Sequence, residues 1–203
     1  MNLQSPEGLA VWPKLNKPDD KYDKDGVYTV KIAVPESEAV DTITTLEKIL
    51  NEDYSGHCKE QKRQKLRKAE NPWIDEYDKD GVATGNILFK FKMKAKTASG
   101  IEMRPILVDA DMKPMSDNIG GGSRLIVSYE PRTWYVPAVG VGMTLRLKGV
   151  QVLDLKEYSG GSNPDQLGFQ KRDGFRTSTT PEESQKEEET EKAIQAHNNN
   201  GDF

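Results

Sequence analysis

Apolar and basic side chains alternate from Phe89 to Lys96 in the stretch 87-ILFKFKMKAK-96. Because successive side chains of a strand point to opposite faces, this pattern predicts a strand over 87–97 with one apolar face. The other face would carry Lys90, Lys92, Lys94 and Lys96, with no acidic residue nearby in the chain. Such a face is either a solvated, edge-protecting surface or a track for a polyanion.

The same two-residue period predicts further strands at 27–35, 101–109, 123–130 and 143–155. The phase of the last segment slips after Gly149, which indicates a β-bulge in a sharply curved strand. From Glu36 to Asn51 the apolar residues recur at helical spacing, whereas residues 1–26 predict turns. Five short strands with one or two inserted helices predict a mainly β fold, an OB-fold five-stranded barrel.

A second concentration of positive charge follows the predicted helix. The segment 59-KEQKRQKLRKA-69 has six bases and one acid, and its residues have good helix propensity. Leu66 and Ala69 are its only apolar residues, so it is either a solvated helix or a basic arm. Beside the lysine strand it would offer a polyanion a second contact.

The formal charge of −4 is distributed unevenly along the 203 residues. Residues 177–203 carry seven acids and two bases, whereas the rest of the chain is close to neutral. Only 34% of the residues are hydrophobic, and the periodicity stops after residue 158, so part of the chain is expected to be disordered. We predict an OB-fold nucleic-acid-binding domain over 1–158, a linker over 159–176 and a disordered acidic tail over 177–203.

Few patterns support catalysis or metal binding. Cys58 is the only cysteine, so no intrachain disulfide can form, and with two histidines it is too little for a structural zinc site. The repeat YDKDGV at 22–27 and 77–82 lacks the closing glutamate of a calcium loop and predicts Asp-Gly turns. No catalytic residue, metal or cofactor is predicted, although Asp109 and Asp111 leave a nuclease-type carboxylate pair as an alternative.

The sequence shows no sign of a membrane protein. No apolar run reaches the length that a transmembrane helix needs. The N-terminal stretch MNLQSPEGLAVWPK has no basic region followed by an apolar one, so no signal peptide is expected. We therefore predict no membrane partner.

Aromatic residues are interleaved with cations between the last two predicted strands. In 128-SYEPRTWYVPAVG-140, Trp134 and Tyr135 follow Arg132 and are predicted to be exposed, whereas Tyr129 is in phase with a core face. Unpaired bases stack on exposed aromatic rings, and cations contact the phosphates, so the pattern suits single-stranded nucleic acid. The candidate DNA-binding residues are Lys90, Lys92, Lys94, Lys96, Arg104, Arg124, Arg132, Trp134, Tyr135, Arg146 and Lys148.

The order and spacing of several motifs resemble one known family. The runs FKFKMKAK and IGGGSRLIVSYEPRTWYVPAVGVGMTLRLKGVQVLDL, with the terminal GDF, resemble the single-stranded DNA-binding proteins of short-tailed T-odd-type bacteriophages. The likeness covers most of the chain, is tightest over 86–161 and includes GVYTVKIAVP near the start. It implies an OB-fold homodimer that coats single-stranded DNA in phage replication, recombination and repair, and anneals complementary strands in the host cytoplasm.

The resemblance also implies roles for particular residues. Lys90 and Lys92 match the DNA groove, and Trp134 matches an aromatic loop position. The family has another aromatic two places before the tryptophan, where this chain has Arg132, so Tyr135 or the guanidinium would take its place. The tail would compete with DNA for the groove and would bind phage replication proteins, a polymerase and a helicase-primase, through Glu187, Glu188, Glu189, Asp202 and Phe203.

The sequence thus predicts a non-enzymatic, sequence-independent single-stranded DNA-binding protein. One alternative is an OB-fold protein-interaction module whose charged face only solvates the barrel. A second alternative is a metal-dependent nuclease built around Asp109 and Asp111.

Overall fold

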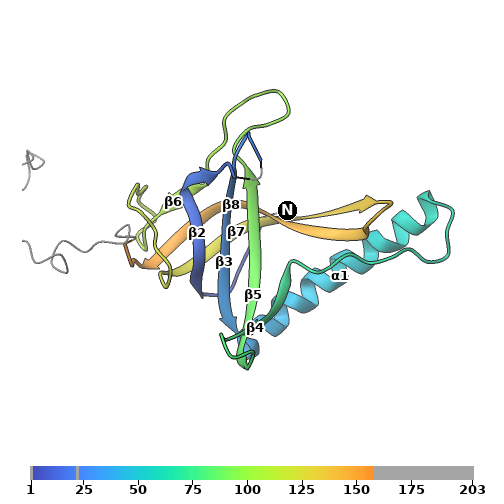
Figure 1. Cartoon of the computed structure of the whole chain (residues 1–203), viewed down its shortest axis with the longest axis horizontal. Coiled ribbons are helices and arrows are strands. Elements are labelled where there is room, and N and C mark those ends of the chain that lie inside the picture. The colour runs from blue at the N-terminus through green and yellow to red at the C-terminus, as the bar shows by residue number, and fades with distance from the viewer. Residues whose placement is uncertain (1, 22, 158–203) are drawn as a thin grey trace, which may run out of the picture. The chain divides into compact units, whose positions relative to one another are not determined.

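The computed structural model describes residues 2–21 and 23–157, which lie in the first of two compact units, Met1–Gly161 (Figure 1). In chain order the elements are β1 (Leu3–Gln4), β2 (Gly8–Asp19), β3 (Val27–Pro35), α1 (Glu36–Glu60), β4 (Trp73–Tyr77), β5 (Ala83–Lys94), β6 (Ile106–Val108), β7 (Arg124–Val136) and β8 (Gly140–Asp154). The predicted linker and tail, and with them the boundary at residue 158, lie outside the described residues.

Five of these strands close into a barrel. Strand β2 pairs with β3, β3 with β5, β5 with β8, β8 with β7, and β7 again with β2. All five contacts are antiparallel except β5 with β8, where Phe91 lies beside Leu145 in a parallel pair. A closed five-stranded barrel of this kind is an OB-fold, so the predicted fold class is confirmed.

The alternation read from the sequence sets the two faces of the barrel wall. On β5 the side chains of Ile87, Phe89, Phe91 and Met93 are all buried, and so is Ala95 directly after the strand. The Phe91 ring packs on the Tyr129 ring with centroids 5.1 Å apart, and burial raises the pKa of the Tyr129 phenol to about 12. Tyr129 is therefore a core residue, as predicted, and the lysines of β5 point away from the core.

Two predicted strand assignments were wrong. Strand β2 lies within residues 1–26, which the sequence assigned to turns. The strand accommodates Pro13 and Pro18 because both occur where its pairing with β3 is irregular, so the missing N–H groups break no regular ladder. The predicted strand 101–109 shrinks to β6, which pairs with β8 outside the barrel. The five barrel strands are therefore not the five that the periodicity selected.

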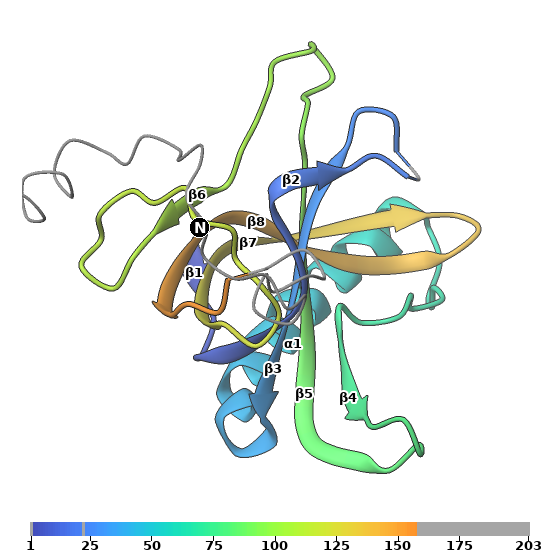
Figure 2. The same ribbon diagram turned by 60° about the vertical axis from the view of Figure 1, so that its left-hand side comes forward.

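Strands β7 and β8 continue as a paired hairpin through Val136 and Gly140, and we call its outer part, residues 131–144, the arm (Figure 2). The long loop expected between the predicted strands 123–130 and 143–155 was wrong, because both strands extend and only residues 137–139 form the turn. The predicted bulge is confirmed: Ser128 pairs with Gly149 and Tyr129 with Leu147, which leaves Lys148 as the additional residue.

Helix α1 supports the arm. It is longer than the predicted Glu36–Asn51, and its last turns lie against β7, where Thr133 Oγ1 donates to Asp53 Oδ2 at 2.6 Å. The basic segment is not a helix beyond Glu60, and the Tyr54 hydroxyl both donates to Leu66 O and accepts from Leu66 N. This segment then runs beside the arm, with Arg67 O and Val141 N joined by a 2.8 Å hydrogen bond.

The repeated YDKDGV motifs act as turns, as predicted. Gly26 and Gly81 both have a φ of +78°, and Asp78 Oδ1 accepts from the backbone of Asp80 and Val82. Among residues 2–21 and 23–157, no helix combines the length and apolar character that membrane crossing requires.

Candidate nucleic-acid interface

The outward face of the barrel carries cations on three neighbouring strands. Lys31 of β3 lies directly beside Lys90 of β5, and Lys92 of β5 lies beside Arg146 of β8. Lys94 and Lys96 continue the series at the end of β5. Because like charges that face each other across a sheet are destabilising, folding alone gives no reason for this arrangement.

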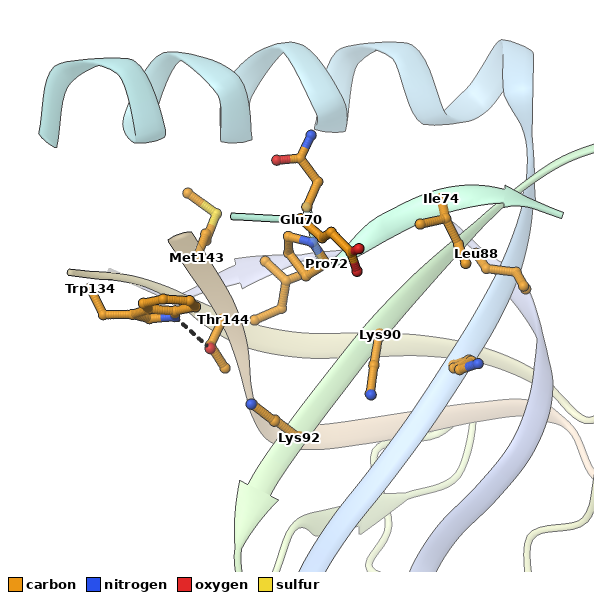
Figure 3. A pocket seen from close by; sticks show the side chains of 12 residues that line it. Glu70, Pro72, Ile74, Leu88, Lys90, Lys92, Trp134, Met143 and Thr144 are labelled. Carbon is orange, nitrogen blue, oxygen red and sulfur yellow. Dashed lines mark hydrogen bonds between the residues drawn. The ribbon is translucent and has the colours of Figure 1, made fainter. Parts of the chain in front are cut away.

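Two hollows run along these cations. The first, of about 320 Å³, is lined by Lys31, Lys90, Lys92, Trp134 and apolar residues that include Pro72 and Leu88 (Figure 3). The second, of about 480 Å³, is lined by Lys92, Lys94, Lys96, Arg132 and Arg146. Lys92 and Thr144 line both hollows, so the two hollows are adjacent, and we call them together the basic groove.

Trp134 forms one wall of the groove. Its indole Nε1 donates to Thr144 Oγ1 at 3.1 Å, as the dashed line in Figure 3 marks. The ring lies across Gly142 so closely that a Cβ at this position would overlap it. One side of the ring is thus covered by backbone and its polar edge is bonded, so the ring is held in place beside Lys92. A fixed aromatic face next to cations is the arrangement on which an unpaired base can stack.

Acidic residues orient some of the cations. Glu130 accepts from Arg132 at 2.8 Å and from Lys148 at 2.9 Å, and Asp23 lies 3.8 Å from Lys94. The hydrogen bond from Lys148, with additional attraction from Arg132, lowers the pKa of Glu130 below its ordinary value of 4.5. Glu130 is therefore ionised at neutral pH and fixes two of the candidate residues beside the groove.

The lowered pKa of Glu130 predicts an effect on stability. A carboxylate with a depressed folded-state pKa stabilises the protein above its unfolded pKa and loses this effect as the pH falls through the folded value. We therefore expect Glu130→Gln to lower the Tm at pH 7, and the Tm difference from the wild type to shrink as the pH falls below the ordinary value of 4.5. Thermal unfolding across this range would measure it, with exposed Glu47→Gln on α1 as the control. A difference independent of pH would contradict the role of this carboxylate.

The structure brings most of the predicted DNA-binding residues together but not all. The groove contains Lys90, Lys92, Lys94, Lys96, Arg132, Trp134 and Arg146. Lys148 lies close by through Glu130, and Arg104 lies on the exposed loop after Met103, a groove residue. Arg124 lies at the far end of β7, beside Leu9 and 3.9 Å from Glu7, so it is separate from the groove.

Tyr135 is also separate from the groove. Neighbouring residues of a strand face opposite ways, and Tyr135 packs toward α1, with its ring centroid 6.2 Å from that of His57. A role for Tyr135 in DNA binding stays a prediction, and the position of its ring beside α1 does not support this role. Lys31 is the groove cation that the sequence reasoning missed, because a single lysine within 27-VYTVKIAVP-35 gives no signal until β3 and β5 are paired.

The carboxylates of the nuclease alternative have structural partners. Asp109 Oδ1 accepts from the backbone N–H groups of Asp111 and Lys113, and the Asp111 carboxylate lies 3.5 Å from the Lys113 ammonium. These contacts are those of a turn, and turn formation explains both acids.

Comparisons with known proteins agree with this geometry. The model of the family described as single-stranded DNA-binding protein, bacteriophage T7, matches residues 8–155, which is most of the chain. The chain belongs to this family. The family is defined by DNA binding and not by a catalysed reaction, which supports the prediction of a non-enzymatic protein.

Individual relatives are similar to different extents. The single-stranded DNA-binding protein of enterobacteria phage T3 is 32% identical over an alignment of 114 residues, and the alignment covers 52% of this chain and only 48% of the T3 protein. The crystal structure of gp2.5, a single-stranded DNA-binding protein of bacteriophage T7, has a TM-score of 0.66 at 25% identity and covers 88% of this chain and 99% of its own. A single-stranded DNA-binding protein of bacteriophage Enc34 in complex with ssDNA has a TM-score of 0.53 at 16% identity, over 78% and 89%, and shares the fold.

Proposed function

We propose that this chain binds single-stranded DNA, without sequence preference, in the basic groove. The observation that carries the proposal is that cations of β3, β5 and β8 and the hydrogen-bonded ring of Trp134 line two adjacent hollows that share Lys92. Phosphates would neutralise cations that otherwise repel one another, and bases would stack on the indole. Membership of a family described by single-stranded DNA binding supports the same function.

The apolar part of the groove fits this ligand. Leu88 and Ile74 lie across the first hollow from Trp134, and Pro72 lies between them (Figure 3). A single strand offers charged phosphates and flat, poorly hydrated bases, and this hollow offers cations and apolar surface together. Contacts to phosphates and ring faces do not distinguish one base from another, so binding should be independent of sequence.

We further propose that the acidic tail regulates this binding. Residues 177–203 would occupy the groove when DNA is absent and would recruit phage replication proteins, such as a polymerase or a helicase-primase, through Glu187, Glu188, Glu189, Asp202 and Phe203. Phage DNA replication and recombination in the host cytoplasm, and action as a homodimer, belong to the same proposal. The charge contrast between the tail and the groove supports it.

The salt dependence of binding tests the proposal. If about five of the groove cations contact phosphates, log K against log salt should have a slope of about −3.5. Fluorescence anisotropy with a labelled oligothymidine would measure the slope for the full chain and for a chain that ends at Arg176. The shorter chain should bind more tightly, because it lacks the competing acids.

Three results separate the alternatives. Steep salt dependence with tighter binding on truncation supports both the groove and the tail. Steep salt dependence without an effect of truncation supports the groove and rejects competition by the tail. Absence of binding at low salt by both chains rejects the DNA-binding function and favours a protein-interaction module.

A further inference from the structure

Trp12 is the most exposed large hydrophobic side chain among residues 2–21 and 23–157, with 82% of its surface accessible. Its backbone has a φ of +50°, a left-handed conformation that is a true outlier for a bulky residue. An exposed indole contributes no hydrophobic burial energy to folding, and the left-handed backbone at Trp12 is strained. Neither the packing of the barrel nor the preference of the backbone explains a tryptophan here.

A β-bulge creates this conformation. On β2, Val11 pairs with Lys31 and Lys14 pairs with Thr29, so Trp12 and Pro13 together lie opposite a single residue of β3. Bulges whose first residue is left-handed normally have glycine at this place. The chain has a tryptophan where glycine would be best for folding, and the bulge turns this residue outward.

The bulge lies beside the basic groove. Lys31, which lines the first hollow, is on the strand next to Val11, and Lys90 is on the strand after it. Counted through β3 and β5, strands β2 and β8 are three inter-strand steps apart, about 14 Å along that side of the barrel wall. Trp134 contacts β8 through Thr144, so the two indoles flank the lysine rows of β3 and β5 from opposite sides.

Charge near Trp12 suits the same ligand. Lys14 follows it on the outward face of β2 and is exposed, and Lys31 lies across the strand pair. A nucleic-acid strand that leaves the groove over β3 would thus meet a cation and then an aromatic face. Alternating cations and aromatic rings are the usual composition of a single-stranded nucleic-acid path.

We propose that Trp12 is a second base-stacking platform, which extends the DNA path from the basic groove across β3 to β2. The inference rests on the proposed function, since it assigns a further contact to the same ligand. In this arrangement the strain at Trp12 positions the indole for a base, and the bound strand spans the barrel face between Trp134 and Trp12.

Substitution of Trp12 by glycine separates the contribution of the indole ring from that of the backbone conformation. Trp12→Gly removes the indole but places at the bulge the residue that its φ favours, so the Tm should be unchanged or higher. Its affinity for a labelled oligothymidine of about 16 nucleotides should fall by roughly 5-fold or more, with the slope against log salt unchanged, because stacking releases no counterions. Trp12→Phe keeps an aromatic face and should retain most of the wild-type affinity.

Two control variants distinguish loss of stacking at Trp12 from other effects on binding. Tyr77→Ala removes an aromatic ring that is 59% exposed at the end of β4 and lines neither hollow, and should leave binding unchanged. Lys90→Gln should reduce the salt slope by about 0.7, which contrasts with the unchanged slope of Trp12→Gly.

The outcomes are distinct. Weaker binding by Trp12→Gly with an unchanged slope, restored by phenylalanine, supports the platform. Wild-type affinity in Trp12→Gly overturns the platform but leaves the proposed binding in the basic groove unaffected. An equal loss of affinity in the glycine and phenylalanine variants, or a large fall in the Tm of Trp12→Gly, also overturns the platform. Absence of binding by the wild type overturns both this inference and the proposed function.

Discussion

Replacing Lys90 and Lys92 together by glutamine is expected to weaken the binding of single-stranded DNA roughly 60-fold at about 50 mM salt. The two side chains lie at the centre of the basic groove, and Lys92 lines both of its hollows. Each phosphate contact on a single strand contributes about 0.7 to the slope of log K against log salt, so the loss of two should reduce the slope by about 1.4. Anisotropy titrations at several salt concentrations would measure both quantities.

The fold of this variant should be intact. Both lysines are exposed, and Lys90 faces Lys31 directly across the strand pair, so removal of its charge relieves a repulsion. The Tm should therefore be equal to or above that of the wild type. The double variant Lys48→Gln/Lys79→Gln removes two exposed charges from α1 and from the turn before β5, and should leave the slope unchanged. Equal slopes in the groove variant and the wild type would remove these lysines from the DNA path.

Truncation of Phe91 to alanine should cost about 3–5 kcal/mol of the free energy of unfolding. Phe91 is 1% exposed, packs on Tyr129 and lies beside Leu145 at the parallel contact that closes the barrel. Loss of the Phe91 ring would leave a cavity where β5, β7 and β8 meet. The surrounding backbone cannot move in to fill it, because the strands are fixed by hydrogen bonds to their neighbours. Urea unfolding followed by circular dichroism would give the free-energy difference.

The matched control for Phe91 is an exposed ring. Tyr77→Ala truncates a side chain that is 59% exposed and should change the stability by no more than about 0.5 kcal/mol. If Phe91→Ala were equally mild, the contact between β5 and β8 would not hold the barrel closed. The same measurement would show whether the groove depends on this contact, since Lys92 and Arg146 are neighbours through it.

The arm explains how a β protein of this kind can present an ordered aromatic ring. Strand pairing continues through Trp134 and Gly142, and α1 holds the other side of the arm through Asp53 and Thr133. The basic segment adds a hydrogen bond between Arg67 and Val141. The indole thus lies on a paired and supported hairpin and not on a loop.

The local pattern of apolar and polar residues was sufficient to predict which face of each strand is buried. The alternation from Phe89 to Lys96 identified which residues of β5 are buried and which are exposed, and the phase of Tyr129 identified it as core. The slip after Gly149 located the bulge, and the change of period located the start of α1 at Glu36. These features depend on the geometry of consecutive residues, so the sequence alone determined them.

Features that depend on pairing between distant strands needed the tertiary structure. Strand β2 has a weak local pattern because its bulge at Trp12 interrupts the alternation, and only its pairing with β3 and β7 identifies it as a barrel strand. Closure of the barrel also brought Lys31 into the groove and separated Arg124 from it. The sequence determined which faces are basic and which are buried, whereas the non-local register of the strands decided which cations and rings lie on one surface.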